Sequence, residues 1–159
     1  MKEKVVILMG SEHDLEFAQE ISKTLKNLGL KYILRVASAH KTPEKVLRIL
    51  KEYANEKIVF ITVAGRSNAL SAFVDANTPR PVIACPPYSD KFAGIDIYSS
   101  LRVPSGVASL TTIEPESAAL AAAKILSLEN NGLQRIIEKY QRDKRTSIEK
   151  ADDSIKKLK

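Results

Sequence analysis

Three short segments of this 159-residue chain carry the side chains best suited to binding and chemistry. They are residues 10–14 (Gly-Ser-Glu-His-Asp), 38–42 (Ser-Ala-His-Lys-Thr) and 65–68 (Gly-Arg-Ser-Asn), and each follows an apolar run typical of a buried strand. The carboxyl ends of parallel strands meet at one edge of an open α/β sheet, where such proteins bind ligands. We therefore expect hydroxyls, backbone amides, cations and one histidine to converge in one crevice, a combination that suits a small phosphorylated substrate.

The first segment places Gly10 and Ser11 at a predicted strand-to-helix turn. A glycine lets the backbone approach a ligand closely, and free amides at a helix start favour an anion. The Ser11 hydroxyl can donate as well. Asp14 has two candidate roles, as a helix cap or as an acceptor for ribose hydroxyls. His13 lies in or beside the first helical turn, and we interpret it as a surface or capping residue.

The second segment contains the candidate group for proton transfer, His40. An imidazole changes its protonation state near neutral pH, with a reference pKa of about 6.5. The adjacent Lys41 would help to hold an anionic ligand and would disfavour protonation of the histidine. The alternative interpretation is a polar loop in which Thr42 caps the following helix.

The third segment begins another helix with small residues and side-chain donors. Such a segment can form a nest of amides for a phosphate or carboxylate, to which Arg66 would add charge. A solvent-exposed turn is the alternative. Cys85 is predicted to be a small buried residue at a strand end and not a nucleophile, because no histidine can be assigned beside it. Residues 102–106 form a constrained loop that could close over a ligand or contact another subunit.

The elements that must position these segments alternate between strand and helix patterns. Apolar runs predict strands over residues 5–9, 32–36, 58–63 and 82–85, and helical spacing predicts helices over 15–28, 43–53, 68–75 and 116–128. Residues 88–108 are loop-like and too polar for the core. Repeated β-α units with continuous apolar strands predict an α/β fold: a three-layer, doubly wound parallel sheet. The prediction is one domain over residues 1–159, with its core in 1–129.

Residues 130–159 are a predicted helical extension with two apolar stripes. One stripe is Leu133, Ile136, Ile137 and Tyr140, and the other is Ile148, Ala151, Ile155 and Leu158. The sheet is already complete by Leu128, so an extra amphipathic helix needs another surface on which to bury its face. It could pack on the parent domain or cross onto a neighbouring subunit, and we favour the second.

Composition and charge exclude several classes. A single cysteine allows no internal disulfide and fits a reducing cytosol, and two histidines argue against an ordinary zinc site. No apolar run approaches the roughly 20 residues that span a membrane, and the first strand begins too early for a signal peptide. Residues 130–159 carry nine Lys/Arg and five Asp/Glu, so most of the net charge of +6 lies in the tail. That tail has one aromatic residue, Tyr140, and we expect no nucleic-acid binding.

Five separated motifs together resemble one family, the phosphoribosylaminoimidazole carboxylases. They are Met-Gly-Ser at residues 9–11, Ser-Ala-His-Lys-Thr at 38–42, Ala-Gly-Arg-Ser-Asn at 64–68, Cys-Pro-Pro at 85–87 and the segment 96–106. The resemblance covers residues 4–128 and implies a flavodoxin-like fold. The mutase branch of the family usually has Ser-Ala-His-Arg, a Gly-Ala-Gly-Gly-Ala-Ala-His segment and Pro-Gly-Gly. This chain has Lys41, Ser71 and Pro104-Ser105-Gly106 instead, and so resembles the second class, which carboxylates aminoimidazole ribonucleotide directly.

The resemblance implies a function and residue roles. The reaction would be the reversible carboxylation of 5-aminoimidazole ribonucleotide by carbon dioxide in purine biosynthesis, in the cytoplasm and without a cofactor or metal. His40 would transfer the proton, and Ser11, Asp14 and Lys41 would contact the nucleotide, with amides and hydroxyls at Gly10, Ser11 and Ser38 beside its phosphate. The residues expected to cradle carbon dioxide and the new carboxylate are Gly65, Arg66, Ser67 and Asn68, with Ser71 nearby.

The family also implies a homo-oligomer, an octamer or a tetramer, with sites at subunit junctions. Two other functions remain open from the sequence. One is the mutase, which rearranges N5-carboxyaminoimidazole ribonucleotide, and the other is a non-catalytic nucleotide-binding module.

Overall fold

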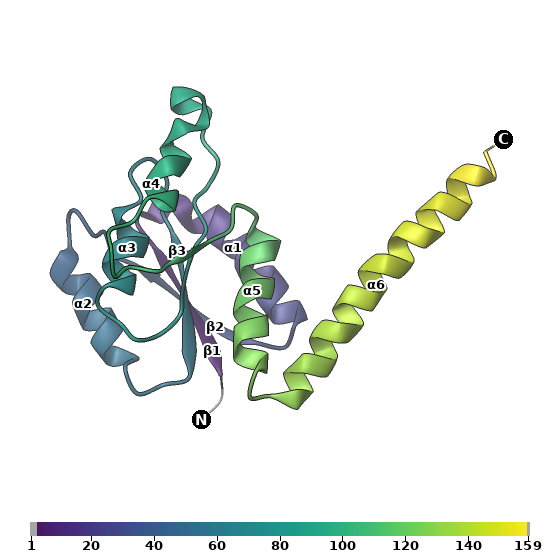
Figure 1. The fold of residues 1–159 in the computed structure, drawn as a ribbon, viewed down its shortest axis with the longest axis horizontal. Coiled ribbons are helices and arrows are strands. Elements are labelled where there is room, and N and C mark those ends of the chain that lie inside the picture. Colours follow the sequence, from purple (N-terminus) through teal and green to yellow (C-terminus); the bar gives the residue numbers. More distant parts are fainter. Residues whose placement is uncertain (1–2, 159) are drawn as a thin grey trace.

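The computed structural model describes residues 3–158 and has one parallel sheet of five strands in the order β2-β1-β3-β4-β5 (Figure 1). The strands are β1 (Lys4–Met9), β2 (Lys31–Val36), β3 (Ile58–Val63), β4 (Val82–Ala84) and β5 (Leu110–Thr111). This is the flavodoxin-like order, in which the direction of strand addition reverses between β1 and β3. The predicted fold class is confirmed.

The strand register aligns the three segments that carry the chemistry. Met9 pairs with Val36 of β2 on one side and with Val63 of β3 on the other. The chain therefore leaves all three strands at the same level, at the point where strand order reverses. Residues 10, 37 and 64 begin the three turns that surround this point.

Alternate residues of each strand face opposite layers of helices. On one face, Val5, Ile7 and Met9 pack with α1 (Leu15–Asn27) and α5 (Pro115–Ser127). On the other face, Val6 and Leu8 pack with α2 (Pro43–Glu52) and α3 (Ala69–Asp75). Four fully buried alanines of α5 let that helix approach the sheet and α1 closely: Ala118, Ala119, Ala122 and Ala123.

Residues 88–108 contain more structure than the sequence predicted. A 3-10 helix, η2 (Lys91–Ile97), leads into the short helix α4 (Tyr98–Leu101), and Ser100 is buried. The prediction of a loop too polar for the core was wrong here, because buried hydrogen bonds satisfy the polar side chain of Ser100. The hydroxyl of Ser100 accepts from Asn68, and its carbonyl accepts from Thr111. The strand β5 was also not predicted, since two residues show no periodicity.

The C-terminal helix α6 (Asn131–Lys156) divides into two halves. Asn130 caps its start by accepting a hydrogen bond from the amide of Leu133, and Leu133 and Ile137 are buried in the core shared with α1 and α5. Every described residue from Arg142 onward is exposed. The first apolar stripe therefore packs on the parent domain. The prediction that the whole extension crosses onto a neighbouring subunit was wrong for this half. The second stripe covers no part of the parent domain (Figure 1). Within residues 3–158, no helix is both long and apolar enough to cross a membrane.

Candidate active site

The three turns enclose a polar crevice of about 340 Å³ at the carboxyl ends of β1, β2 and β3. Its walls bring together most of the predicted site residues. They are Gly10, Ser11, Asp14, Ser38, His40, Lys41, Gly65, Arg66 and Ser67, joined by His13, Ala39, Ala64 and Leu70. The predicted residues Asn68 and Ser71 do not line this crevice and lie buried behind it.

The first turn is closed by its own side chains. The amide of Ser11 donates to the Asp14 carboxylate at 3.0 Å, and the amide of His13 donates to the Ser11 hydroxyl oxygen at 3.3 Å. The amide of Gly10 donates to the carbonyl of Val63 at 2.8 Å. The expectation of free amides at Gly10 and Ser11 was therefore wrong. The carbonyl of Val63 satisfies the amide of Gly10, and a capping box around a short 3-10 turn satisfies that of Ser11. The Ser11 hydroxyl proton remains available to a ligand.

Asp14 closes the first turn but makes no side-chain cap to α1, and its contact with ribose hydroxyls stays a prediction. Its carboxylate caps the turn and also faces the crevice. Burial raises the pKa of the Asp14 carboxyl above its usual range, although the Ser11 amide and the nearby His13 oppose this shift. His13 is exposed, as predicted, but it also lies at the rim of the crevice.

Gly10 lies where the exits of β1 and β3 come closest together. A Cβ atom on Gly10 would lie 3.3 Å from the Cβ of Ala64 and 3.8 Å from the carboxylate of Asp14. Glycine at this position therefore lets the first and third turns approach each other across the base of the crevice.

The second turn leaves His40 without a protein hydrogen bond. The amide of Ser38 donates to the Thr42 hydroxyl oxygen at 2.9 Å, and the amide of Lys41 donates to the Ser38 hydroxyl oxygen at 3.2 Å. Thr42 thus stabilises the turn and makes no side-chain cap to α2, which begins with Pro43 instead. His40 and Lys41 are exposed. Within the described part of the chain, the His40 imidazole bonds to no protein group, so it is free to face a ligand.

The third turn is fixed mainly by segment 96–100. The amide of Arg66 donates to the Asp96 carboxylate, and the amide of Asn68 donates to the Ser99 hydroxyl oxygen. Two of the four amides in the nest expected at residues 65–68, those of Arg66 and Asn68, are therefore bonded within the protein. Asn68 also caps α3 by accepting from the amide of Ser71, and its side-chain amide donates to Ser100. These bonds explain why Asn68 does not reach the crevice.

Ser71 is fully buried, and its hydroxyl has no hydrogen-bond partner within residues 3–158. An unpaired buried hydroxyl is costly, because folding removes its water without replacing that hydrogen bond. The Ser71 hydroxyl lies outside the crevice, whereas Gly65 and the side chain of Ser67 line it, and the described residues provide no hydrogen-bond partner for the Ser67 hydroxyl.

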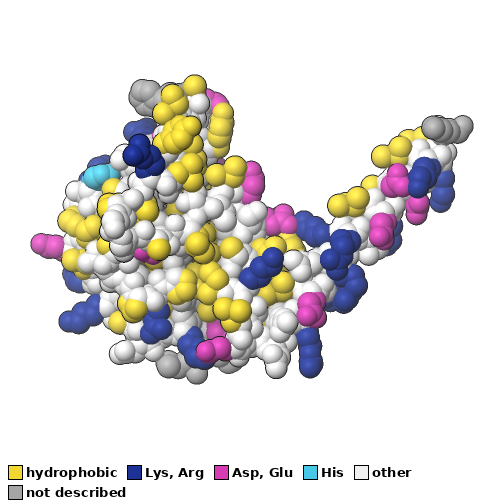
Figure 2. Space-filling view, in the orientation of Figure 1, with side chains coloured by type: hydrophobic (Ala, Val, Ile, Leu, Met, Phe, Trp, Pro, Cys, Tyr) yellow, Lys and Arg dark blue, Asp and Glu magenta, His cyan; other side chains and the backbone are white. Residues whose placement is uncertain are grey.

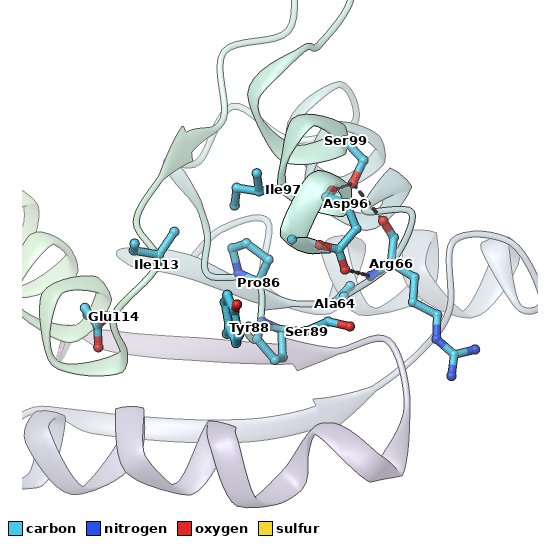
Figure 3. Close-up of a pocket in the computed structure, with 13 residues that line it drawn as sticks. Ala64, Arg66, Pro86, Tyr88, Ser89, Asp96, Ile97, Ser99, Ile113 and Glu114 are labelled. Carbon is cyan, nitrogen blue, oxygen red and sulfur yellow. Dashed lines mark hydrogen bonds between the residues drawn. The ribbon is translucent and has the colours of Figure 1, made fainter. Parts of the chain in front are cut away.

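A second cavity of about 310 Å³ adjoins the crevice and shares Ala64, Gly65 and Arg66 with it. Its other walls are mainly apolar and come from the chain after β4 (Figure 3), notably Pro86, Pro87, Tyr88, Ile97 and Ile113. Sequence reasoning did not predict this cavity, although Pro86-Pro87 directly follows a predicted strand and was a usable signal. Cys85, just before these prolines, is buried as predicted, and burial raises the pKa of its thiol to about 12.

Comparison with known proteins gives consistent results. The model of the family described as "AIR carboxylase" matches residues 4–147 of this chain. A phosphoribosylaminoimidazole carboxylase of Archaeoglobus fulgidus is 56% identical over 153 residues, which are 96% of this chain and 85% of that protein. A second one, from Treponema denticola, is 46% identical over 99% of this chain and 100% of its own length. The crystal structure of Treponema denticola PurE superposes with a TM-score of 0.95, at 46% identity, over 98% of this chain and 99% of that one.

Proposed function

This chain belongs to the AIR carboxylase family, and we propose that it carboxylates 5-aminoimidazole ribonucleotide directly with carbon dioxide in purine biosynthesis. The observation that carries the proposal is the position of His40. Its imidazole, which has no hydrogen-bond partner among residues 3–158, lines a polar crevice where three strand ends meet, together with Lys41 and Gly65.

Side chains, and not backbone amides, would hold the ribonucleotide. The hydroxyls of Ser11 and Ser38 each accept one hydrogen bond from the backbone and keep a proton for the phosphate. The ammonium of Lys41 would add positive charge beside them. The Asp14 carboxylate would accept from the ribose hydroxyls, and Gly10 would allow the sugar to approach the floor of the crevice.

The chemical step needs one proton acceptor. The aminoimidazole ring is enamine-like, so an electron pair of the ring forms the new bond from C4 to the carbon of carbon dioxide. One C=O π pair then moves to oxygen and completes the carboxylate. The intermediate still has a proton on C4, and His40 would remove it, so that the C–H electron pair restores the aromatic ring. In the reverse direction the imidazolium would return that proton.

The third turn would hold carbon dioxide and the new carboxylate. Gly65 offers a wall without a side chain, Ser67 and Arg66 line the crevice, and the unpaired hydroxyl of Ser71 lies buried behind the turn. Since the donor groups of Asn68 are already bonded within the protein, we assign Asn68 to holding this turn in place. Keeping so small a molecule beside C4 is mainly a matter of orientation and excluded water.

Direct carboxylation and the mutase reaction differ in substrate, so one assay separates them. Purified protein is given aminoimidazole ribonucleotide and bicarbonate or carbon dioxide, without ATP, and the carboxylated product is measured. We expect turnover. Conversion of only the N-carboxylated isomer would establish the mutase instead.

A His40→Asn variant tests the role of the imidazole. We expect it to bind the ribonucleotide but to lose most turnover, by the roughly 10²- to 10⁴-fold typical of a missing acid–base group. The matched variant is His13→Asn at the crevice rim, for which we expect a much smaller loss in kcat. Absence of turnover by the wild-type protein, together with ribonucleotide binding, would favour a non-catalytic module.

We also propose that the chain works as a homo-oligomer, a tetramer or an octamer. The support is the second apolar stripe of α6, where Ile148, Ile155 and Leu158 are 72%, 65% and 84% exposed. Hydrophobic side chains are visible along this free part of the helix (Figure 2). A second copy of the chain would cover them.

A further inference from the structure

The turn between β3 and α3 holds a residue in a backbone conformation that it does not favour. Arg66 has φ +60°, in the left-handed region that glycine adopts readily and most L residues avoid. Residues held in such regions persist only where the surroundings determine them strongly, and they cluster at functional sites. The question is what holds Arg66 there.

Three side chains from one distant segment hold this turn, two through its backbone and one through the side chain of Asn68. The Asp96 carboxylate accepts from the amide of Arg66 at 3.3 Å. The Ser99 hydroxyl oxygen accepts from the amide of Asn68 at 2.8 Å. Its proton has two acceptors within reach, the carbonyl oxygen of Asp96 at 2.7 Å and that of Arg66 at 3.2 Å. The Ser100 hydroxyl accepts from the side-chain amide of Asn68 at 2.9 Å.

The contacts with Arg66 are made to its backbone and not to its charged group. Figure 3 shows Asp96 and Ser99 reaching the amide and the carbonyl of Arg66 while the guanidinium points away from both. Within residues 3–158, no ion pair joins Asp96 to Arg66. The contacts therefore fix the path of the chain and leave the guanidinium free.

The turn that is held in this way is the common wall of the two cavities. Ala64, Gly65 and Arg66 face the polar crevice on one side and the apolar cavity on the other. If the left-handed residue relaxed, the wall would move relative to His40, which stands on a separate turn. Orientation of this wall is what the proposed carbon dioxide site requires.

We propose that Asp96 and Ser99 are positioning residues, which hold the turn at Arg66 left-handed and so fix the carboxylate-binding wall opposite His40. This inference rests on the function proposed above. Neither residue lines the polar crevice in which we place the ribonucleotide, although both line the adjoining apolar cavity. We therefore assign both to the turn, which they contact directly.

The first test separates positioning from binding. We expect Asp96→Ala and Ser99→Ala to lower kcat by about tenfold to a hundredfold, the loss typical of misplaced reacting groups. The KM for the ribonucleotide should stay within about twofold, because its phosphate and ribose contacts lie on the other two turns. Asp96→Asn keeps an acceptor oxygen and should recover most of the lost kcat. The control is Asp90→Ala, which removes an exposed carboxylate next to η2 that has no side-chain hydrogen bond in the described structure.

The second test uses the backbone preference at position 66. Arg66→Gly and Arg66→Ala both remove the guanidinium, but only glycine adopts the left-handed conformation without cost. We expect Asp96→Ala to lower kcat strongly in the Arg66→Ala background and by less than about threefold in the Arg66→Gly background. Equal losses in both backgrounds would overturn the proposal.

A third measurement does not depend on activity. Hydrogen exchange of the peptide that covers residues 64–70 should quicken in Asp96→Ala, while exchange in the β1 and β2 turns stays unchanged. If the wild-type protein converts only the N-carboxylated isomer, the direct-carboxylase proposal fails, and the kinetic tests are run with that substrate. Unchanged exchange together with an unchanged kcat would show that Asp96 does not position the turn.

Discussion

Removal of residues 146–159 should dissociate the proposed homo-oligomer while leaving the parent domain folded. Every described residue of this segment is exposed, and its apolar stripe has no surface to cover within one chain. The cut falls after the last contacts of α6 with α5. In those contacts Tyr140 hydrogen-bonds to Glu116, and the Lys144 ammonium lies 2.7 Å from the same carboxylate.

The size of the effect follows from the exposed side chains. Full burial of a large aliphatic side chain stabilises by about 1.5 to 3 kcal/mol. Ile148, Ile155 and Leu158 are already partly covered, so together they would contribute about 3 to 7 kcal/mol per arm on docking. Each 1.4 kcal/mol is about tenfold in a dissociation constant, so loss of one arm would weaken association by roughly two to five orders of magnitude. A free helix of about a dozen residues is itself marginal in water, which also favours a docked arm.

The place of the cut matters because only the first half of α6 packs on the parent domain. A deletion of residues 130–159 would also remove Leu133 and Ile137, which are only 5% exposed and belong to the core. Loss of a buried leucine or isoleucine side chain costs about 2 to 5 kcal/mol, so that longer deletion would confuse dissociation with unfolding. The shorter deletion keeps both residues.

The assay is molar mass by light scattering, with circular dichroism to check the fold. The double variant Ile148→Asp/Ile155→Asp should dissociate like the deletion. Its matched control, Lys150→Asp/Lys157→Asp, introduces the same side chains on the opposite face of the helix and should keep the assembly. An unchanged mass for both the deletion and the Ile variant would refute the reasoning, as would a monomeric wild-type protein.

Three further predictions concern the site and its surroundings. Burial raises the pKa of the Asp14 carboxyl in the folded protein. The free energy of unfolding should therefore fall as the pH rises from the ordinary pKa of this group to its raised pKa, and this group should cause no further change at higher pH. Asp14→Asn should therefore be at least as stable as wild type in urea at pH 7, should lose that advantage near pH 4, and should bind the ribonucleotide more weakly; a clear loss of stability at pH 7 would contradict this. With its pKa raised from 9.0 to about 12, Cys85 stays a thiol in the folded state while it ionises in the unfolded one, so stability should fall by up to roughly 1.4 kcal/mol per pH unit between those values. Cys85→Ala should remove that part of the alkaline slope in denaturant titrations, and native protein at pH 8 should resist alkylation. Gly10→Ala should cost about 1 kcal/mol in thermal unfolding and lower kcat/KM about tenfold, since the new Cβ would press on Ala64 at 3.3 Å; full activity would show that the two turns are not coupled.

The sheet and the place of the crevice were predictable because their signals are local. Continuous apolar runs marked β1, β2 and β3, and the register of those strands then fixed where the turns after Met9, Val36 and Val63 would meet. The capping of the first turn could also be predicted from the sequence. Ser11 and Asp14 stand three residues apart, as in a capping box, and this spacing predicts that the amide of Ser11 is not free.

The support of the third turn was not predictable, because its partners are far away in the sequence. Asp96 lies 30 residues from Arg66, and Ser99 lies 31 residues from Asn68. No local sequence pattern predicts either of these hydrogen bonds. The left-handed conformation of Arg66 has no sequence signal, since arginine is not a residue that prefers it. Such contacts follow from tertiary packing of η2 and α4 on α3.

The way the turns are closed changes how the site should be understood. Each turn satisfies much of its own backbone with neighbouring side chains, through Asp14 in the first, Thr42 in the second and Asp96 in the third. A rigid, internally bonded turn offers few amides to an anion, so recognition passes to hydroxyl protons and exposed cations. The same bonding restricts motion of the three walls, while the His40 imidazole lacks a protein hydrogen bond within the described residues. This arrangement suits the proposed reaction, in which His40 would move one proton while the turns keep the other atoms aligned.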